Sequence, residues 1–368
     1  MAVPPKVAFA AETFDSLPGW QSDDHQAAFA AFRLSAFRAL EKPYRSGAIG
    51  VPAEAFQPAF AEARALAEPT ADQARSFFER HFRPFLIRTE GGTGFVTGFY
   101  EPEARASLIK TAEYSYPIYR RPADLIEIDE GDRPEGLDPG FRFARQTDGR
   151  FREYFDRRAI ESGALEGQNL EIAWLADRVD LFFIHIQGAA RLRMADGDTL
   201  RVTYAAKSGH PFTGIGRVLA DLGEIPLAQV TMQSIRAWLA ANPDRLDEIL
   251  WQNRSFIFFR EADIEDEEAG PVAAAKVPLT AGRSIAVDRL LHTFATPFFV
   301  VSPNLGAFGT AGFRRLMIAQ DTGSAIVGPA RGDLFTGSGR EAGEIAGIIR
   351  NEADFHMLVP VALAERWA

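Results

Sequence analysis

Two carboxylates that could act as acids or bases lie twelve positions apart near the C-terminal end of the chain. Asp321 and Asp333 stand among glycines and close to four apolar residues, which are Ile326, Val327, Leu334 and Phe335. An acid in partly apolar surroundings resists ionisation, so its pKa rises toward the range useful for donating a proton. Glycines let the backbone turn sharply and let a bulky ligand come close. The stretch therefore indicates acid–base chemistry on a large substrate, with a pair of glycine-rich turns as the alternative.

A second interpretation of the same stretch is an aspartic protease, because Asp321-Thr322-Gly323 matches the signature of that class. Those enzymes need two carboxylates that share a proton. The chain holds no second Asp-Thr-Gly or Asp-Ser-Gly, so one copy of it cannot supply both. Proteases built from two identical chains are far shorter, and Gln320 stands where such a site has an apolar residue. The pattern disfavours a protease.

Other familiar catalytic and metal-binding patterns are missing from the sequence. The chain has no cysteine, so it offers no disulfide, thiolate ligand or cysteine nucleophile. His185, His210 and His292 are widely separated and do not form a zinc-binding motif. There is also no Gly-x-Ser-x-Gly, the turn that carries the nucleophile of many hydrolases.

The length of 368 residues leaves room for two domains, and the net charge of −10 excludes a general affinity for nucleic acid or anionic lipid. No apolar run approaches the length of a membrane-spanning helix. The first six residues contain no apolar segment of an export signal.

The elements that must position the two acids follow from periodicity. Apolar residues at helical spacing predict helices over residues 23–41, 54–67 and 71–82, and again over 230–252. Asp23 or Asp24 suits the N-cap of the first helix. Alternating and glycine-punctuated runs predict strands over 91–100, 255–260 and 276–360. Residues 105–228 are predicted to hold several short strands, among them 180–187 and a hairpin over 191–202. The acidic run 261–268 predicts a solvated loop.

Several segments, taken together, carry a resemblance to one family. They are 97–102, 183–188, 209–217, 253–259, 284–289 and 321–333. In this order, from about residue 90 to the C-terminus, they resemble the lytic murein transglycosylase A family with its C-terminal three-aspartate (3D) domain. The three aspartates fall on Asp288, Asp321 and Asp333. Phe99 departs from the family's usual tyrosine, and alanines follow Gly188 where small polar residues are usual.

The resemblance implies a mainly β fold with flanking helices, in two domains. Residues 1–103 and 242–368 would form a discontinuous double-psi β-barrel domain that includes the N-terminal helices. Residues 104–241 would form an inserted second β-barrel. The glycan would lie in a groove between the two, as ligands often do at domain interfaces.

The resemblance also implies the reaction. The family cleaves the β-1,4 bond between N-acetylmuramic acid and N-acetylglucosamine in peptidoglycan, and the muramyl C6 hydroxyl attacks its own C1 to form 1,6-anhydromuramic acid. Hydrolytic glycosidases normally use two carboxylates. An intramolecular nucleophile has an effective concentration of roughly 10⁵ M or more, so a single carboxyl suffices, first as acid and then as base.

The family's roles carry over residue by residue. Asp333 is the expected acid and base, and Asp321 is expected to tune it or to bind sugar hydroxyls. Tyr100 is expected to stack on a sugar ring, and Asp288 either binds substrate or is a structural residue of the barrel. The remaining expected substrate contacts are Thr97, Glu101, Gln187 and Gly188. No metal or organic cofactor is expected.

The expected partners are peptidoglycan glycan strands, with no nucleic acid. The protein is expected to be a monomer in the periplasm and a candidate outer-membrane lipoprotein, with a lipid anchor in the precursor and a signal segment absent from this chain. A non-catalytic glycan-binding protein of the expansin type is the alternative, since a fold does not determine a function.

Overall fold

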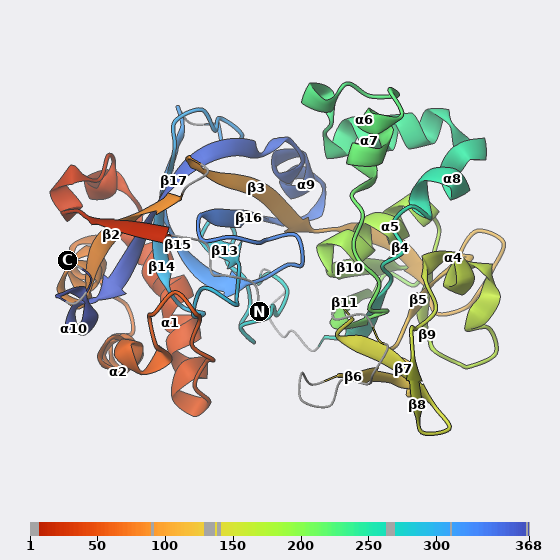
Figure 1. The fold of residues 1–368 in the computed structure, drawn as a ribbon, viewed down its shortest axis with the longest axis horizontal. Coiled ribbons are helices and arrows are strands. Elements are labelled where there is room, and N and C mark those ends of the chain that lie inside the picture. The colour runs from red at the N-terminus through yellow and green to blue at the C-terminus, as the bar shows by residue number, and fades with distance from the viewer. Residues whose placement is uncertain are drawn as a thin grey trace. The chain divides into compact units, whose positions relative to one another are not determined.

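The computed structural model describes residues 7–89, 92–128, 137, 141–262, 269–309, 311–365 and 367. The chain forms two compact units, one of Met1–Tyr100 with Asp266–Ala368 and one of Glu101–Glu265 (Figure 1). The predicted domain boundary after residue 103 lies close to the division between the units after Tyr100. The predicted boundary after residue 241 lies inside the second unit, which continues to Glu265. The reason is strand β12 (Ile257–Glu261), which pairs with β11 (Thr199–Lys207) and keeps the chain in the second unit.

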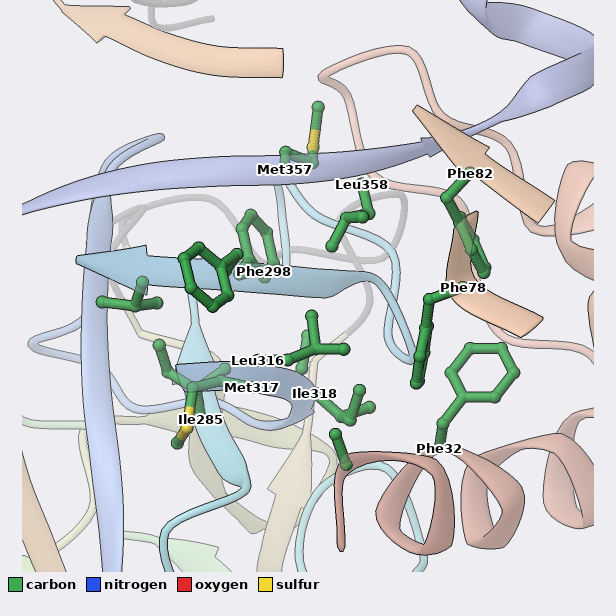
Figure 2. Close-up of a cluster of buried hydrophobic side chains, with 14 of the residues drawn as sticks. Phe32, Phe78, Phe82, Ile285, Phe298, Leu316, Met317, Ile318, Met357 and Leu358 are labelled. Carbon is green, nitrogen blue, oxygen red and sulfur yellow. The ribbon is translucent and has the colours of Figure 1, made fainter. Parts of the chain in front are cut away.

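The first unit begins with β1 (Val7–Ala11) and three helices, which confirm the predicted helical segments. These helices are α1 (His25–Glu41), α2 (Gln57–Ala65) and α3 (Ala71–His81). The carboxylate of Asp24 accepts a hydrogen bond from the backbone N–H of Ala27 at 3.0 Å and so caps α1. Figure 2 shows Phe32 of α1 beside Phe78 and Phe82, so the aromatic face of these helices joins the buried core.

Six strands of the first unit close into a barrel, in the order β3-β17-β14-β15-β13-β16 and back to β3. Their bounds are β3 Gly94–Glu101, β13 Ser284–Val287, β14 Pro297–Ser302, β15 Phe313–Asp321, β16 Arg331–Ser338 and β17 Arg350–Pro360. Strand β2 (Phe82–Thr89) pairs with β17 and carries β1 on its far side. This arrangement confirms the predicted mainly β fold with flanking helices.

The barrel core consists of large apolar side chains from opposite strands. By strand register Ile285, Phe298, Met317 and Met357 share one face of the sheet, while Leu316 and Ile318 lie on the opposite face, which packs against α1; all six are fully buried (Figure 2). Burying one such side chain contributes about 1.5–3 kcal/mol, so these residues stabilise the unit strongly.

One helix in the C-terminal part was not predicted. Residues 276–360 were expected to hold only strands and turns, but α9 covers Gly339–Ile348. It contains Gly339 and Gly343 and begins without a side-chain cap, so its sequence has little intrinsic helical preference. Its buried small residues, which include Ala342 and Ala346, pack closely against the barrel, and this tertiary contact determines the helix. A short helix, α10 (Val361–Ala364), follows β17.

The second unit contains a six-stranded sheet in the order β12-β11-β10-β4-β9-β5. A bridge between Arg120 and Phe259 joins its two end strands, which closes the sheet as the second predicted barrel. The other strands of this sheet are β4 Glu103–Ser107, β5 Tyr116–Tyr119, β9 Glu171–Leu175 and β10 Ala189–Met194. A separate three-stranded sheet consists of β6 Leu125–Glu127, β7 Phe143–Thr147 and β8 Arg150–Arg152.

Helices α6 (Ile215–Asp221), α7 (Met232–Ala241) and α8 (Leu246–Leu250) cluster in the second unit (Figure 1), where the last two confirm the prediction for 230–252. A single helical turn, α4 (Arg157–Ala159), precedes them. The predicted hairpin over 191–202 is also confirmed, as β10 and β11.

The segment 180–187 was predicted as a strand and is a helix, α5 (Arg178–Gln187). Its periodicity was ambiguous because a short apolar run fits a buried strand and a buried helix equally well. The capping residues at its two ends show that the segment is a helix. Asp177 accepts hydrogen bonds from the N–H groups of Val179 and Asp180, and Gly188 ends the helix at a φ of 77°.

Most of the acidic run predicted as a loop, residues 263–268, lies outside the described residues. Among the helices that the structure describes, none is long and apolar enough to cross a membrane.

Candidate active site

Strand register brings the two predicted acids onto one face of the first barrel. Ala286 of β13 pairs with Asp321 of β15 on one side and with Asp333 of β16 on the other. Residues directly opposite one another in a sheet share a face. Two strand spacings separate the backbones of the two acids, which is roughly 9–10 Å.

This face lies opposite the barrel core. Ile285, Val287 and Leu334, the neighbours of Ala286 and Asp333 along their strands, belong to the core cluster. The face with the acids instead borders a small buried apolar cluster of Phe99, Leu279, Ala286, Ile326 and Phe335. The acids therefore stand beside apolar side chains, as the sequence predicted, while remaining only partly buried themselves.

Asp333 is held by a hydroxyl and lies near a cation. Thr97 of β3 donates a hydrogen bond from Oγ1 to Oδ1 of Asp333 at 2.6 Å. Burial raises the pKa of Asp333, while the Thr97 hydrogen bond and the charge of Arg331 oppose that rise. The net shift is upward, which favours a carboxyl that keeps its proton until it is needed.

Asp321 has a raised pKa as well, of about 6. Burial is the main cause, the hydrogen bonds from the N–H groups of Thr322 and Ala274 oppose it, and the charge of Asp333 adds to it. The bond from Ala274 to Oδ1 is 3.1 Å long. The two carboxyls therefore influence each other, and ionising one makes the other harder to ionise.

Asp288 supports the loop that joins the two acids. Its Oδ1 accepts a hydrogen bond from the N–H of Leu290 at 3.0 Å, and its Oδ2 accepts one from the N–H of Gly328 at 2.9 Å. Nearby, Nε2 of His292 donates to the carbonyl of Pro329 at 2.8 Å, and burial lowers the pKa of His292 to about 4. Of the two roles left open for Asp288, this geometry favours the structural one.

Tyr100 is only 7% exposed. A Cβ added at Gly343 of α9 would lie 2.7 Å from Cε2 of Tyr100, so the ring packs directly against that helix. Little of the ring is left for a sugar to stack on, and its stacking role stays a prediction.

Glu101, Gln187 and Gly188 belong to the second unit. Glu101 is 1% exposed and forms ion pairs with Arg191 and Arg201, each at 2.8 Å. A carboxylate buried between two guanidinium groups has its charge balanced inside the protein, so this geometry favours a structural role. Gln187 is the half-buried last residue of α5, and Gly188 is its C-cap.

No group of three or more His, Cys, Asp or Glu side chains within the described ranges could hold a metal ion.

Comparison with known proteins decides the family. Residues 95–260 match the MltA specific insert domain and residues 283–359 match the 3D domain. The membrane-bound lytic murein transglycosylase A of Escherichia coli K12 is 33% identical over 281 residues, which cover 73% of this chain and 68% of that protein. The chain belongs to the lytic murein transglycosylase A family.

Solved structures agree with this assignment. The membrane-bound lytic murein transglycosylase from Agrobacterium tumefaciens is 50% identical with a TM-score of 0.93, over 98% of this chain and 100% of that one. MltA from Neisseria gonorrhoeae is 34% identical with a TM-score of 0.78, over 98% and 97% of the two chains. The family and the two-domain architecture predicted from the sequence are therefore confirmed.

Sequence reasoning missed one residue beside the acids. Arg331 donates a hydrogen bond from Nη2 to Oγ1 of Thr97 at 2.7 Å, and another from Nη1 to the carbonyl of Gly332. Its guanidinium also lies over the ring of Phe95, 5.7 Å from the centroid. The signal was present in the sequence, because residues two apart on a strand share a face, and Arg331 precedes Asp333 by two.

Proposed function

We propose that this protein is a peptidoglycan lytic transglycosylase in which Asp333 is the acid and then the base. The observation that supports this role is the placement of Asp333 on a partly buried barrel face, where apolar neighbours favour its protonated form. Family membership supports the substrate, since the relatives are named as murein transglycosylases.

The proposed reaction needs no separate nucleophile from the protein. Protonated Asp333 gives its proton to the glycosidic oxygen as the bond to C1 of N-acetylmuramic acid breaks. The resulting carboxylate takes the proton of the C6 hydroxyl as that oxygen bonds to C1, which closes the 1,6-anhydro ring. Asp333 ends the cycle protonated, so atoms and charges balance without water. The bound sugar supplies a nucleophile of very high effective concentration.

Asp321 tunes this cycle in our proposal. An ionised Asp321 opposes a second negative charge on Asp333, because like charges repel, and the pKa of about 6 of Asp321 keeps part of it protonated near neutral pH. Thr97 orients Asp333 through the 2.6 Å hydrogen bond. We retain Gln187 and Gly188 as proposed sugar contacts of the second unit.

We infer that the protein works outside the cytoplasmic membrane, because peptidoglycan lies there. The named relatives are described as membrane-bound, which supports a lipid anchor on the precursor as the means of attachment. A monomer that binds single glycan strands completes the proposal.

Digestion of purified peptidoglycan by the isolated protein tests the function. We expect turbidity to fall as soluble muropeptides are released. Binding to peptidoglycan without any release would contradict the proposal and would favour the non-catalytic, expansin-type alternative.

A further inference from the structure

Two side chains, Arg331 and Thr97, form a chain of hydrogen bonds that ends on Asp333, the proposed acid. Arg331 Nη2 lies 2.7 Å from Thr97 Oγ1, which lies 2.6 Å from Asp333 Oδ1. Arginine carries only donors, so Thr97 must accept from Arg331. The single hydroxyl proton of Thr97 is then available to Asp333, and Thr97 donates it to Oδ1 of Asp333.

The direction of this chain distinguishes the two oxygens of Asp333. Oδ1 receives the threonine proton, so a proton carried by the carboxyl itself resides on Oδ2. Within the described part of the chain, Oδ2 makes no hydrogen bond. One oxygen is therefore fixed by the protein and the other is available to a ligand.

We propose that Arg331 is a positioning residue, which acts through Thr97 to hold Oδ1 of Asp333 as an acceptor and leaves Oδ2 to give and take the proton. This inference rests on the proposed function, because the transfer it describes is the one between Asp333 and the glycan. Arg331 does not touch the sugar in this proposal.

The charge of Arg331 has a second effect on the same step. Donating the proton leaves a carboxylate, and a nearby cation stabilises that charged form. The ring of Phe95 beneath the guanidinium and its bond to the carbonyl of Gly332 fix where the cation lies. Arg331 therefore limits how strongly Asp333 retains its proton, against the burial that favours retention.

The groups around Asp333 include both charged and uncharged side chains. Asp321 on β15 is the second acid, and Lys276 lies close enough to affect Asp321. Strand β13 contributes the apolar Ala286, and β3 contributes the uncharged Thr97. Arg331 is the cation whose charge acts on Asp333 itself.

The test compares Arg331→Gln and Arg331→Lys in the release of muropeptides as a function of pH. An acid catalyst loses activity as pH rises through its pKa. In Arg331→Gln we expect this alkaline limb of kcat/KM to move up by about one pH unit. We expect kcat at the optimum to fall about tenfold with KM unchanged. Arg331→Lys keeps the charge, so its limb should stay within a few tenths of a unit of the wild type.

Thr97 variants test the hydrogen bonds through Thr97 separately from the charge of Arg331. Thr97→Val removes the hydroxyl and should also move the alkaline limb upward, while Thr97→Ser should restore the wild-type profile. Arg340→Gln is the matched control, since it removes an exposed cation of α9 that pairs with Glu344 at the surface. It should leave the profile unchanged.

A carboxyl titration followed by carbon-13 NMR provides a readout independent of activity. The Asp333 signal, assigned by its loss in Asp333→Asn, should titrate at a higher pH in Arg331→Gln than in the wild type. An equal loss of activity at all pH values, with the titration unchanged, would mean that Arg331 only stabilises the barrel and would overturn the inference. A wild-type protein that releases no muropeptide would instead contradict the proposed function. The titration would still show whether Arg331 affects the protonation of Asp333.

Discussion

The protonation of Asp333 depends on contributions of opposite sign. Burial beside Phe99 and Phe335 disfavours the carboxylate, while the Thr97 hydroxyl and the Arg331 guanidinium stabilise it. An acid that must first give and later take a proton needs both forms to be accessible near the working pH. Neither contribution alone would achieve this, because strong burial would fix the proton and strong pairing would remove it.

Replacing Asp333 with Asn keeps the shape of the side chain and removes the transferable proton. We expect cleavage of purified peptidoglycan to fall by a factor of about 10² to 10⁴, with binding retained, because general acid catalysis is lost while other contacts remain. Asp221→Asn, which alters an exposed ion pair with Arg217, is the control. More than a tenth of wild-type activity in Asp333→Asn would show that another residue is the acid.

Asp321 predicts a dependence of stability on pH. Its pKa is about 6 in the folded protein and near 4 when unfolded, so the folded state holds its proton more tightly. The favourable contribution of this group is present below pH 4 and is lost as pH rises to about 6. Asp321→Asn cannot ionise and can still accept the bond from Ala274. Its Tm relative to wild type should therefore rise between pH 4 and pH 7. An unchanged difference across that range would show that Asp321 titrates normally.

At the scale of elements, the close approach of β3 to α9 determines where Thr97 lies. A Cβ on Gly98 would lie 2.8 Å from Cα of Ala346 and 3.0 Å from its carbonyl oxygen. These backbone atoms cannot move without displacing the helix. Only a glycine lets α9 pack against the strand beside the acid's hydroxyl partner.

Gly98→Ala should therefore lower the Tm by several degrees and also reduce activity, because overpacking costs about 1–3 kcal/mol and shifts the adjacent Thr97. Differential scanning fluorimetry and muropeptide release measure the two effects. Gly214→Ala is the matched control, since its nearest neighbour would be 3.8 Å away. Equal Tm values for the two variants would contradict the packing argument.

How far the sequence predicted these elements depends on the signals each carries. Helix α1 combines a long apolar stripe with Asp24 as its cap, so local sequence was sufficient. Helix α5 is a short apolar run whose type depends on its surroundings, and α9 owes its existence to packing of small residues on the barrel. Such tertiary contacts are invisible to local periodicity.

The site was predictable in part for a similar reason. Glycines and apolar neighbours marked Asp321 and Asp333, but only strand register shows that Ala286 lies between them. The burial of Tyr100 against α9 and of Glu101 between two arginines follows from contacts distant in sequence. Arg331 could have been found from its spacing to Asp333 alone.

At the scale of the whole molecule, the decisive question is which nucleophile reaches C1 of the sugar. A hydrolase of this kind needs a second carboxylate to activate water, with the two carboxyl groups roughly 6.5–9.5 Å apart in inverting enzymes. Asp321 is the second acid of this face, and its oxygen Oδ1 already accepts from Ala274. Its raised pKa also makes it a poor base at mildly acidic pH.

We therefore expect the C6 hydroxyl to outcompete water. The released muropeptides should end in 1,6-anhydro-N-acetylmuramic acid, one water lighter than lysozyme products and without a reducing end. Mass spectrometry of the digest, before and after borohydride reduction, distinguishes the two, because only reducing ends gain two hydrogens. The yield should not change when EDTA is added. Reducing muramic acid as the major product would mean that a base activates water. If Asp321→Asn then abolished that product, Asp321 would be the base and the protein a hydrolase.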